Sequence, residues 1–314
     1  MKKQLLLLLF FCTVFQATDA QEKSETIRNR IPMLNGHRFA TTTQLKSPFI
    51  ATSLSTDVGF GSTSLITIPG VEIGDRELFR FQGKIFYVDF NAQYQQKFNS
   101  WLSLFLSVKL AGRLGSDMST IVADGINSVS GGDIGWLIKL KETEKFILSG
   151  SIKATALTGN FINVAEYLQD VIEGEPYPTL SKKVPSTSVG IGLRAAYAFN
   201  PSYGLQANFH ISQGESLQRG TIDNYVTMGI LGDVNLNIKY EVPISLALGY
   251  SLTSTPEVSM DNRGYSSLYT GKIDYTGSND YELGLQFTFY DVQLKSVEAN
   301  TSISKVMLGL KFYL

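Results

Sequence analysis

The sequence predicts an all-β fold, a transmembrane antiparallel up-and-down β-barrel of about 12 strands, and three observations support this prediction. Apolar and polar residues alternate with a period of two along most of the chain after residue 48. The segments that separate these stretches alternate between very short and long. No stretch after the N-terminal 20 residues contains the ~20 consecutive apolar residues of a membrane-spanning helix, so strands would have to cross the membrane.

Eleven stretches show the alternation of a strand with one apolar face. The clearest begins at Leu102, where leucine or valine occupies every second residue up to Leu110 and Ser103, Ser107 and Lys109 lie between them. The stretches are 50–60, 85–95, 101–114, 134–141, 146–157, 188–199, 203–212, 226–240, 244–253, 281–289 and 304–314. Because single-chain bacterial barrels usually have an even number of strands, we expect a weaker twelfth strand within 290–300; totals of about 10 to 14 fit the pattern.

The connections between these stretches differ in length in a regular way. The segments 98–100, 142–145, 200–202 and 241–243 are tight turns, whereas 61–83, 115–133, 158–187, 213–225 and 254–280 are long. Outer-membrane barrels have short turns at the periplasmic rim and longer loops at the extracellular rim. We therefore expect five extracellular loops, with both ends of the barrel chain on the periplasmic side.

The N-terminal part of the chain predicts export. Residues 1–20 have a charged start at Lys2 and Lys3, an apolar stretch and a small-residue cleavage site ending at Ala20. Residues 21–47 are polar without a sustained period, so we expect a periplasmic lead-in or a short segment tucked into the barrel mouth. The barrel is then expected over 48–314. The only cysteine, Cys12, lies within the signal.

Composition argues against several classes of function. The 27 basic and 28 acidic residues nearly cancel, so no overall field favours nucleic acid as a partner. The two histidines, His37 and His210, with no cysteine in the expected mature chain, make a nitrogen or sulfur metal site improbable. No phosphate-binding glycine loop precedes a helix. We expect neither a metal nor a cofactor.

A soluble β-sandwich is the structural alternative, because its strands also alternate when one sheet packs on another. Strands in soluble proteins usually have about 5 to 6 residues. The stretches 101–114 and 226–240 are much longer. They fit a tilted spanning strand of about 9 to 11 residues with an extension above the bilayer, so we favour the barrel.

The last residues of the chain carry a family resemblance. The stretch from Val306 to Leu314 alternates and ends on aromatic residues, although the final residue is leucine rather than the more usual phenylalanine. It resembles the C-terminal strand by which bacterial outer-membrane proteins are passed to the barrel assembly machinery. Together with a Gln21 start after cleavage, the chain resembles outer-membrane barrels of Bacteroidota-type bacteria. This resemblance implies an outer-membrane location, with lipid and the assembly machinery as partners.

If the apolar faces contact lipid, the opposite faces place charged residues in the lumen. These residues are Asp57, Asp89, Lys109, Arg113, Lys153, Arg194, His210, Asp233 and Lys239. Opposite charges can pair and fill a narrow lumen, or they can line a polar pathway and set its selectivity. Small residues on the same faces, such as Gly190 and Gly192, leave room for a solute and favour a passage.

One long loop segment has apolar residues at helical spacing. They are Phe161, Val164, Leu168 and Val171, and Gly174 and Pro176 end the pattern. We expect either a lid packed over the barrel mouth or a hydrophobic pocket outside it. The pocket would resemble that of transporters of the long-chain fatty acid type, although their characteristic N-terminal motif is not evident here.

The best enzymatic candidate is His210-Ile211-Ser212-Gln213-Gly214, followed by Asn224. It resembles the His-x-Ser-x-Gly segment of outer-membrane phospholipase A, except that Gln213 stands where that family has asparagine. The resemblance implies that Ser212 attacks, His210 takes its proton and Asn224 orients the imidazole. Against this, the apolar neighbours of His210 and Ser212 predict that both face the lumen rather than lipid.

The sequence therefore favours a passive channel or transporter for a small molecule, hydrophobic compounds included, with no enzymatic step. A phospholipase A-like lipid hydrolase is the second hypothesis. An adhesive or structural role of the extracellular loops is the third.

Overall fold

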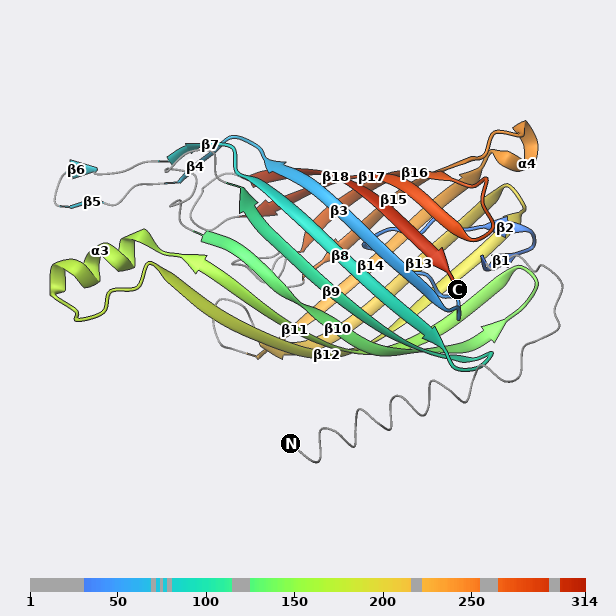
Figure 1. The fold of residues 1–314 in the computed structure, drawn as a ribbon, viewed down its shortest axis with the longest axis horizontal. Coiled ribbons are helices and arrows are strands. Elements are labelled where there is room, and N and C mark those ends of the chain that lie inside the picture. Colours follow the sequence, from blue (N-terminus) through green and yellow to red (C-terminus); the bar gives the residue numbers. More distant parts are fainter. Residues whose placement is uncertain are drawn as a thin grey trace, which may run out of the picture. The chain divides into compact units, whose positions relative to one another are not determined.

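The computed structural model describes residues 31–68, 72–73, 76–77, 81–114, 125–215, 222–254, 265–293 and 300–314. Twelve antiparallel strands form a closed barrel (Figure 1), in which each strand pairs with its neighbour in the chain and the last strand pairs with the first. This confirms the predicted fold class. The expected export signal, residues 1–20, lies outside the described residues.

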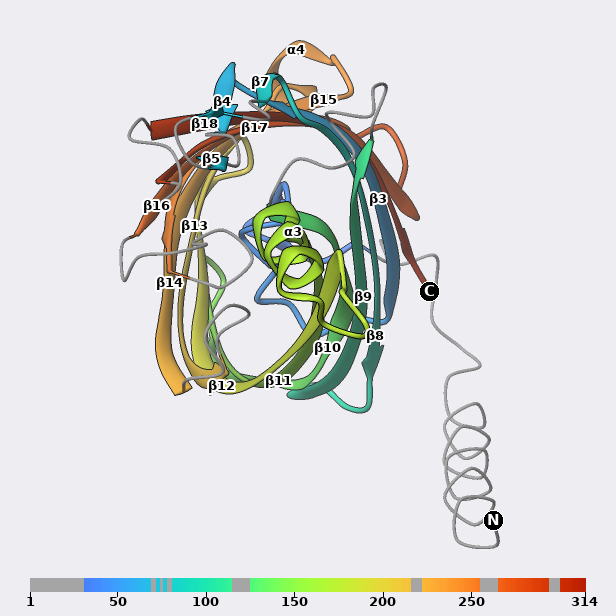
Figure 2. The same ribbon diagram turned by 90° about the vertical axis from the view of Figure 1, so that its left-hand side faces the viewer.

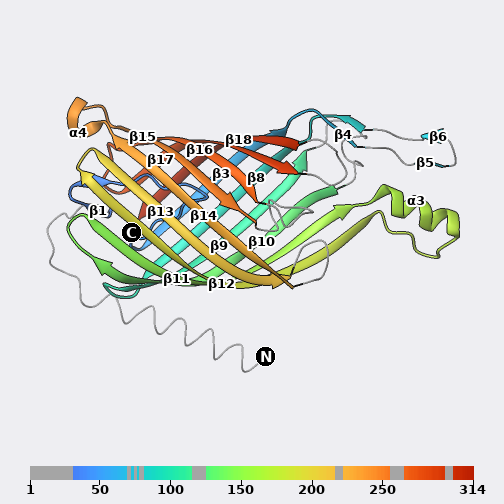
Figure 3. The ribbon, with the colours of Figure 1, turned by 180° about the vertical axis from the view of Figure 1, so that it is seen from behind.

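The strands of the barrel run up and down between two rims (Figure 3). They are β3 (Ser53–Thr63), β8 (Phe86–Lys97), β9 (Leu102–Leu114), β10 (Gly125–Glu142), β11 (Phe146–Ile162), β12 (Ser181–Asn200), β13 (Tyr203–Glu215), β14 (Ile222–Asn235), β15 (Ile244–Thr253), β16 (Ser266–Tyr275), β17 (Tyr281–Gln293) and β18 (Asn300–Tyr313). Short turns join them at one end, which we call the short-turn rim, and longer connections join them at the other, the long-loop rim.

The period of two gives the barrel an apolar outside and a polar inside. On β9, Leu106, Val108 and Leu110 are exposed on the outer face, whereas Ser103 and Ser107 are buried on the inner face. The same division holds around the ring, with exposed outer residues such as Leu248, which is 77% exposed. So much apolar surface around a closed sheet requires a lipid environment, since a soluble protein would not leave it in water.

The twelfth strand is not where the sequence analysis placed it. Residues 290–293 belong to β17 and residue 300 to β18, so the described residues of this range form no separate strand, and 294–299 lie outside the described residues. The additional strand is β16, inside the segment 254–280 that was expected to be a loop. Its alternation is weak because Gly271 occupies an outward position and Leu268 an inward, buried one. The long-loop rim consequently has six connections instead of the five expected.

Other element boundaries also differ from the expected ones. The stretch 226–240 ends as a strand at Asn235, and α4 (Asn237–Tyr240) follows it in the turn to β15. The strands β10, β11 and β12 extend well into the expected loops 115–133 and 158–187. Within the connection from β3 to β8, β4 (Ile66–Ile68) pairs with β7 (Phe81–Gly83) and β5 (Glu72–Ile73) pairs with β6 (Arg76–Glu77).

A helix, α3 (Val164–Glu173), forms in the connection between β11 and β12, as the helical spacing predicted. The Asn163 side chain accepts a hydrogen bond from the Glu166 backbone N–H (3.0 Å), and Gly174 ends the helix in the left-handed conformation at φ 74°. Among the described residues, no helix has both the length and the hydropathy of a membrane span.

Aromatic side chains are exposed around the short-turn rim. They include Phe98, Trp101, Tyr197, Phe199, Tyr203 and Tyr240. Two of them, Tyr197 and Phe199, meet edge to face with ring centroids 5.0 Å apart. Aromatic rings favour the boundary between hydrocarbon and water, so this belt marks one edge of the membrane-embedded surface.

A charge on the outer face should destabilise the barrel far more than the same charge on a loop. We expect Ile191→Arg, in the middle of β12 and 64% exposed, to cost about 2–4 kcal/mol in the free energy of unfolding. The matched control is Tyr177→Arg, which lies between α3 and β12 and is 87% exposed. Urea unfolding in phospholipid vesicles measures both, and equal costs would contradict a lipid-facing position for Ile191.

Candidate functional site

Residues 31–52, which we call the plug, lie inside the barrel near the short-turn rim. Figure 2 shows this segment, in blue, within the ring of strands. Its apolar side chains pack in two clusters on the inner wall. Leu34, Phe39 and Phe49 pack with Ile147, Ala196 and Ala198, and Ala40 and Leu45 pack with Leu231 and Ala247. The segment expected as a lead-in or mouth segment thus occupies the lumen from residue 31 onward.

The plug begins with a tight hairpin. Its strands β1 (Met33–Leu34) and β2 (His37–Arg38) pair across Asn35 and Gly36, whose φ angles are 47° and 72°. Positive φ at both central positions defines a turn that Asn-Gly adopts at little cost. Successive residues of a strand point to opposite faces, so the hairpin sends His37 and Arg38 to different parts of the wall.

His37 is completely buried against β13 and β14. Its Nδ1 donates to the carbonyl oxygen of Pro201 at 3.0 Å, and its Nε2 hydrogen-bonds the carboxylate of Asp233. The other carboxylate oxygen of Asp233 accepts the backbone N–H of Ala40 at 3.1 Å. A Cβ at Gly204 would overlap the His37 ring and lie 2.7 Å from Asp233 Oδ1. Glycine at 204 is therefore what lets His37 lie against the wall.

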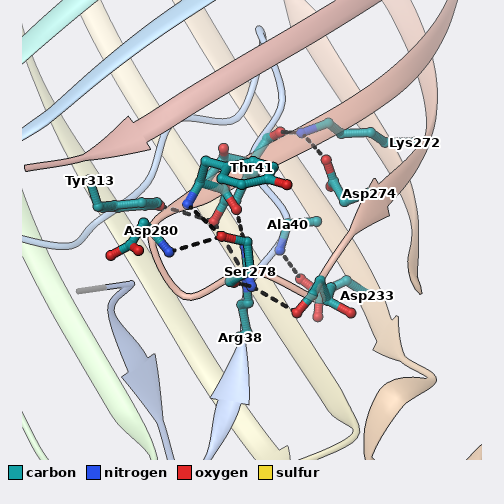
Figure 4. Close-up of polar contacts among 12 residues, drawn as sticks. Arg38, Ala40, Thr41, Asp233, Lys272, Asp274, Ser278, Asp280 and Tyr313 are labelled. Atoms are coloured by element: carbon teal, nitrogen blue, oxygen red, sulfur yellow. Dashed lines mark hydrogen bonds and ion pairs between the residues drawn. The ribbon is translucent and has the colours of Figure 1, made fainter. Parts of the chain in front are cut away.

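Arg38 binds another part of the rim, at the turn between β16 and β17. Its guanidinium donates to the carbonyl oxygens of Thr276 (3.1 Å) and Tyr281 (2.9 Å), and its Nε lies 3.8 Å from Glu282 Oε1. Figure 4 shows Arg38 close to this turn, with Ala40 next to Asp233. One arginine thus satisfies several acceptors that the turn alone leaves unpaired.

The rest of the plug is held by polar side chains of the wall. Lys272 donates to Thr41 O (2.6 Å), Gln286 Oε1 accepts from Thr43 N (3.1 Å), Asn208 donates to Gln44 O (3.1 Å), Arg194 donates to Ser47 O (3.2 Å), Ser149 donates to Pro48 O (2.6 Å) and Gln95 donates to Phe49 O (2.9 Å). All six wall residues lie in the halves of their strands next to the short-turn rim. The plug therefore occupies that half of the lumen and narrows it.

Eight of the nine charged residues expected in the lumen lie on inward positions of their strands. They are Asp57, Asp89, Lys109, Arg113, Lys153, Arg194, His210 and Asp233. Lys239 does not: it lies on α4, exposed, with its Nζ 5.2 Å from the centre of the Tyr240 ring. The alternation that placed Lys239 in the lumen ends four residues earlier, at Asn235.

Several of the lumen charges form ion pairs, within one strand or between strands. Lys305 pairs with Asp89 at 2.6 Å, and Lys272 pairs with Asp274 at 2.7 Å. Asp133 lies near two cations at once, with Lys109 Nζ at 3.5 Å and Lys153 Nζ at 3.7 Å. Neutralisation therefore accounts for some of the lumen charges, and Asp133 has two lysines close to its carboxylate.

The plug adds Lys46 to this charged region. Burial lowers the pKa of Lys46 to about 8, and the neighbouring Asp57 carboxylate partly opposes that shift. Lys109 and Arg194 lower the pKa of Lys46 further, because a second positive charge nearby disfavours its protonated form.

The residues of the expected catalytic set do not converge. His210 and Ser212 face the lumen, as their neighbours predicted. Asn224 pairs with Gln213 and faces outward, since the next residue, Tyr225, is buried on the inner side opposite Ser212. An asparagine on the opposite face of the sheet cannot hold the His210 imidazole. The phospholipase-like arrangement is therefore not assembled in this structure.

The four residues expected to form a loop pocket divide between two elements. Phe161 lies in β11, and Val164, Leu168 and Val171 lie in α3. Val171 is 47% exposed, and its neighbour Ile172 is 66% exposed. The pocket and the lid both stay predictions.

Several residues of the plug and of the lumen were not predicted from the sequence. Asn35-Gly36 is a strong hairpin signal and would have predicted β1 and β2. Asp133, Lys272 and Asp274 fell in segments that were expected to be loops, so their inward positions went unnoticed. Arg38 gave no signal, because its acceptors lie more than 230 residues away in the chain. Among the described residues, no cluster of three or more His, Cys, Asp or Glu could hold a metal ion.

No protein-family model matches the chain, and no curated protein matches it. Among solved structures, it is similar to an outer-membrane channel from Pseudomonas putida F1, with 12% identity, a TM-score of 0.49, and coverage of 88% of this chain and 100% of that chain. It is similar to the NanC porin, with 10% identity, a TM-score of 0.46, and coverage of 82% and 100%. A Pseudomonas aeruginosa FadL homologue matches with 10% identity, a TM-score of 0.43, and coverage of 83% and 90%. Likenesses this distant assign neither a family nor a solute.

Removing the Asp233 carboxylate should loosen the plug. The change Asp233→Ala leaves the buried His37 ring and the Ala40 N–H without their partner, at a cost of roughly 3–5 kcal/mol. We expect a cysteine introduced by Thr42→Cys, at a site that is 5% exposed, to react with a maleimide at least tenfold faster when Asp233→Ala is added.

The matched control is Asp291→Ala, near the long-loop rim, where the carboxylate accepts only the Ser302 hydroxyl at 2.7 Å among its hydrogen bonds in the described residues. We expect Asp291→Ala to leave the rate of maleimide labelling of the Thr42→Cys cysteine unchanged. Equal rates in the two aspartate variants would show that Asp233 does not anchor the plug.

Proposed function

We propose that the protein is an outer-membrane channel through which a small solute diffuses passively, and that the plug sets whether its periplasmic end is open. One observation carries this proposal. The lumen near the short-turn rim is occupied by a separate segment of chain, which is attached to the wall by apolar packing and by many polar contacts. A barrel with a purely structural role has no need of a removable filling.

The chemistry of the wall favours a polar solute. Beyond the plug the inner face carries Asp89, Lys109, Asp133, Lys153 and Lys305, with serine and glycine between them. An apolar solute would gain little from such a wall and would strip water from its charges, which is costly. A polar solute can exchange its hydration for these groups.

The exterior of the barrel and the sequence both support an outer-membrane location. The exposed apolar outer face suits hydrocarbon, the N-terminal residues predict export, and the C-terminal stretch resembles the signal read by barrel assembly machinery. With the short-turn rim in the periplasm, α3 and the longer connections face the cell exterior.

The two other hypotheses have less support. The hydrolase lacks a converging catalytic set, because Asn224 faces outward. Adhesion is compatible with the exposed Ile172 and Tyr177 near α3, but those residues do not explain a charged lumen. Replacing residues 164–178 by a glycine-serine linker would distinguish a channel from an adhesin. A channel would keep its conductance after this change, whereas an adhesin would lose its attachment to a surface.

Weakening the plug should increase solute passage. We expect Arg38→Ala, which removes the contacts to Thr276, Tyr281 and Glu282, to raise the rate of glucose entry into proteoliposomes several-fold over the unaltered protein. Light scattering after mixing measures the rate. Lys239→Ala, on the exposed α4, should leave it unchanged. The channel proposal fails if neither protein, once inserted, admits glucose faster than protein-free liposomes do.

A further inference from the structure

The barrel contains a cluster of positive charge directly beyond the plug. Asp133 on β10 lies between Lys109 on β9 and Lys153 on β11, at 3.5 and 3.7 Å. The carboxylate also accepts the hydroxyls of Ser107 (2.8 Å) and Thr155 (2.6 Å), and its side chain is only 9% exposed. The two lysine side chains remain 31% and 27% exposed, so they, and not Asp133, face the lumen.

Arg194 extends the cluster toward the plug. Its Nη1 donates to Ser47 O at 3.2 Å, and its guanidinium lies 5.2 Å from the centre of the Phe105 ring. Both are neutral groups, so Arg194 keeps its full charge within this region. Lys46, on the plug, interacts electrostatically with Asp57, Lys109, Asp133 and Arg194. Lys46, Lys109, Lys153 and Arg194 thus bring four positive charges into the region of Asp133.

His210 adds an unsatisfied polar atom to the same place. Its Nε2 is buried and has no hydrogen-bond partner among the described residues, and the charges that act on the ring are those of Lys153, Arg194, Asp133 and Lys109. A Cβ at Gly192 would lie 2.9 Å from His210 Cδ2 and 3.0 Å from Ser151 Oγ. The absence of a side chain there lets the His210 ring lie against β12.

We propose that Lys109, Lys153, Arg194 and His210 form an anion-binding site in the lumen, with the plug as its floor, that takes small carboxylates and makes the channel anion-selective. A carboxylate bound there would contact the two lysine ammonium groups on one side and the Arg194 guanidinium on the side nearest the plug. Such a site concentrates anions where the pathway narrows at the plug, which raises their passage over that of cations. This inference rests on the proposed channel function.

A purely structural role is the competing explanation. In that case Lys109 and Lys153 only neutralise Asp133, and their replacement lowers stability without changing ion selectivity. Arg194 distinguishes the two roles, since among the described residues it pairs with no carboxylate and contacts only Ser47 O and the Phe105 ring.

The test measures reversal potentials of the full-length protein in planar bilayers under a KCl gradient. We expect the unaltered protein to prefer chloride over potassium several-fold. Arg194→Gln keeps a donor for Ser47 O and leaves Asp133 with both lysines, and Lys153→Gln leaves Asp133 paired with Lys109. Each should bring the chloride-to-potassium permeability ratio down at least twofold. Lys239→Gln, outside the lumen, is the matched control and should keep the original ratio.

A binding measurement separates failure of this site from failure of the channel. Sodium gluconate should raise the thermal unfolding temperature of the detergent-solubilised protein, whereas sorbitol, the uncharged probe of similar size, should not. The rise should disappear in Arg194→Gln and Lys153→Gln and persist in Lys239→Gln. Gluconate binding without conductance would support the site and refute the channel. Unchanged permeability ratios in both lumen variants, or no effect of gluconate on the unaltered protein, would refute the site.

Discussion

Hydrogen bonding of the backbone across the β18–β3 seam is the constraint on which the rest of the structure depends. Hydrocarbon offers no partners to N–H and C=O groups, so a sheet in lipid cannot keep an open edge. Pairing from Ile303↔Thr63 to Tyr313↔Ser53 removes both edges at once. Closure then divides every strand into an outer face that meets lipid and an inner face that meets an enclosed compartment. The alternation of apolar and polar residues in the sequence reflects this division into two faces.

Closure also creates a lumen whose polar groups need partners, and the plug supplies many of them. Asp233 pairs with His37, Glu282 with Arg38, and Lys272 reaches the Thr41 carbonyl. In a water-filled lumen the same wall groups would be hydrated, so release of the plug exchanges protein hydrogen bonds for water and does not leave bare charges. The net strength of each contact is correspondingly modest. Polar contacts of this kind stabilise the plug because they are numerous, and they can be broken one at a time.

The sequence predicted the local geometry well and the long-range contacts poorly, for a physical reason. Alternation is a property of neighbouring residues, so eleven strands and the inward positions of Asp57, Lys109 and Arg194 could be predicted. It failed where the local signal was weak, as in β16 with Gly271 on its outer face, and where α4 broke the strand before Lys239. The contacts of the plug could not be predicted, because His37 and Asp233 are 196 residues apart and only closure brings them together.

The plug is covalently continuous with the first strand of the wall. It leaves the lumen through Thr52, whose carbonyl accepts the backbone N–H of Leu314 at 3.1 Å, and Ser53 follows it immediately in β3. A blocker on such a tether never diffuses away, and its local concentration at the lumen is fixed by the length of the tether rather than by the amount of protein in the membrane. If the plug leaves the lumen as we propose, its return is a first-order event, equally fast in a cell with few copies of the protein and in one with many.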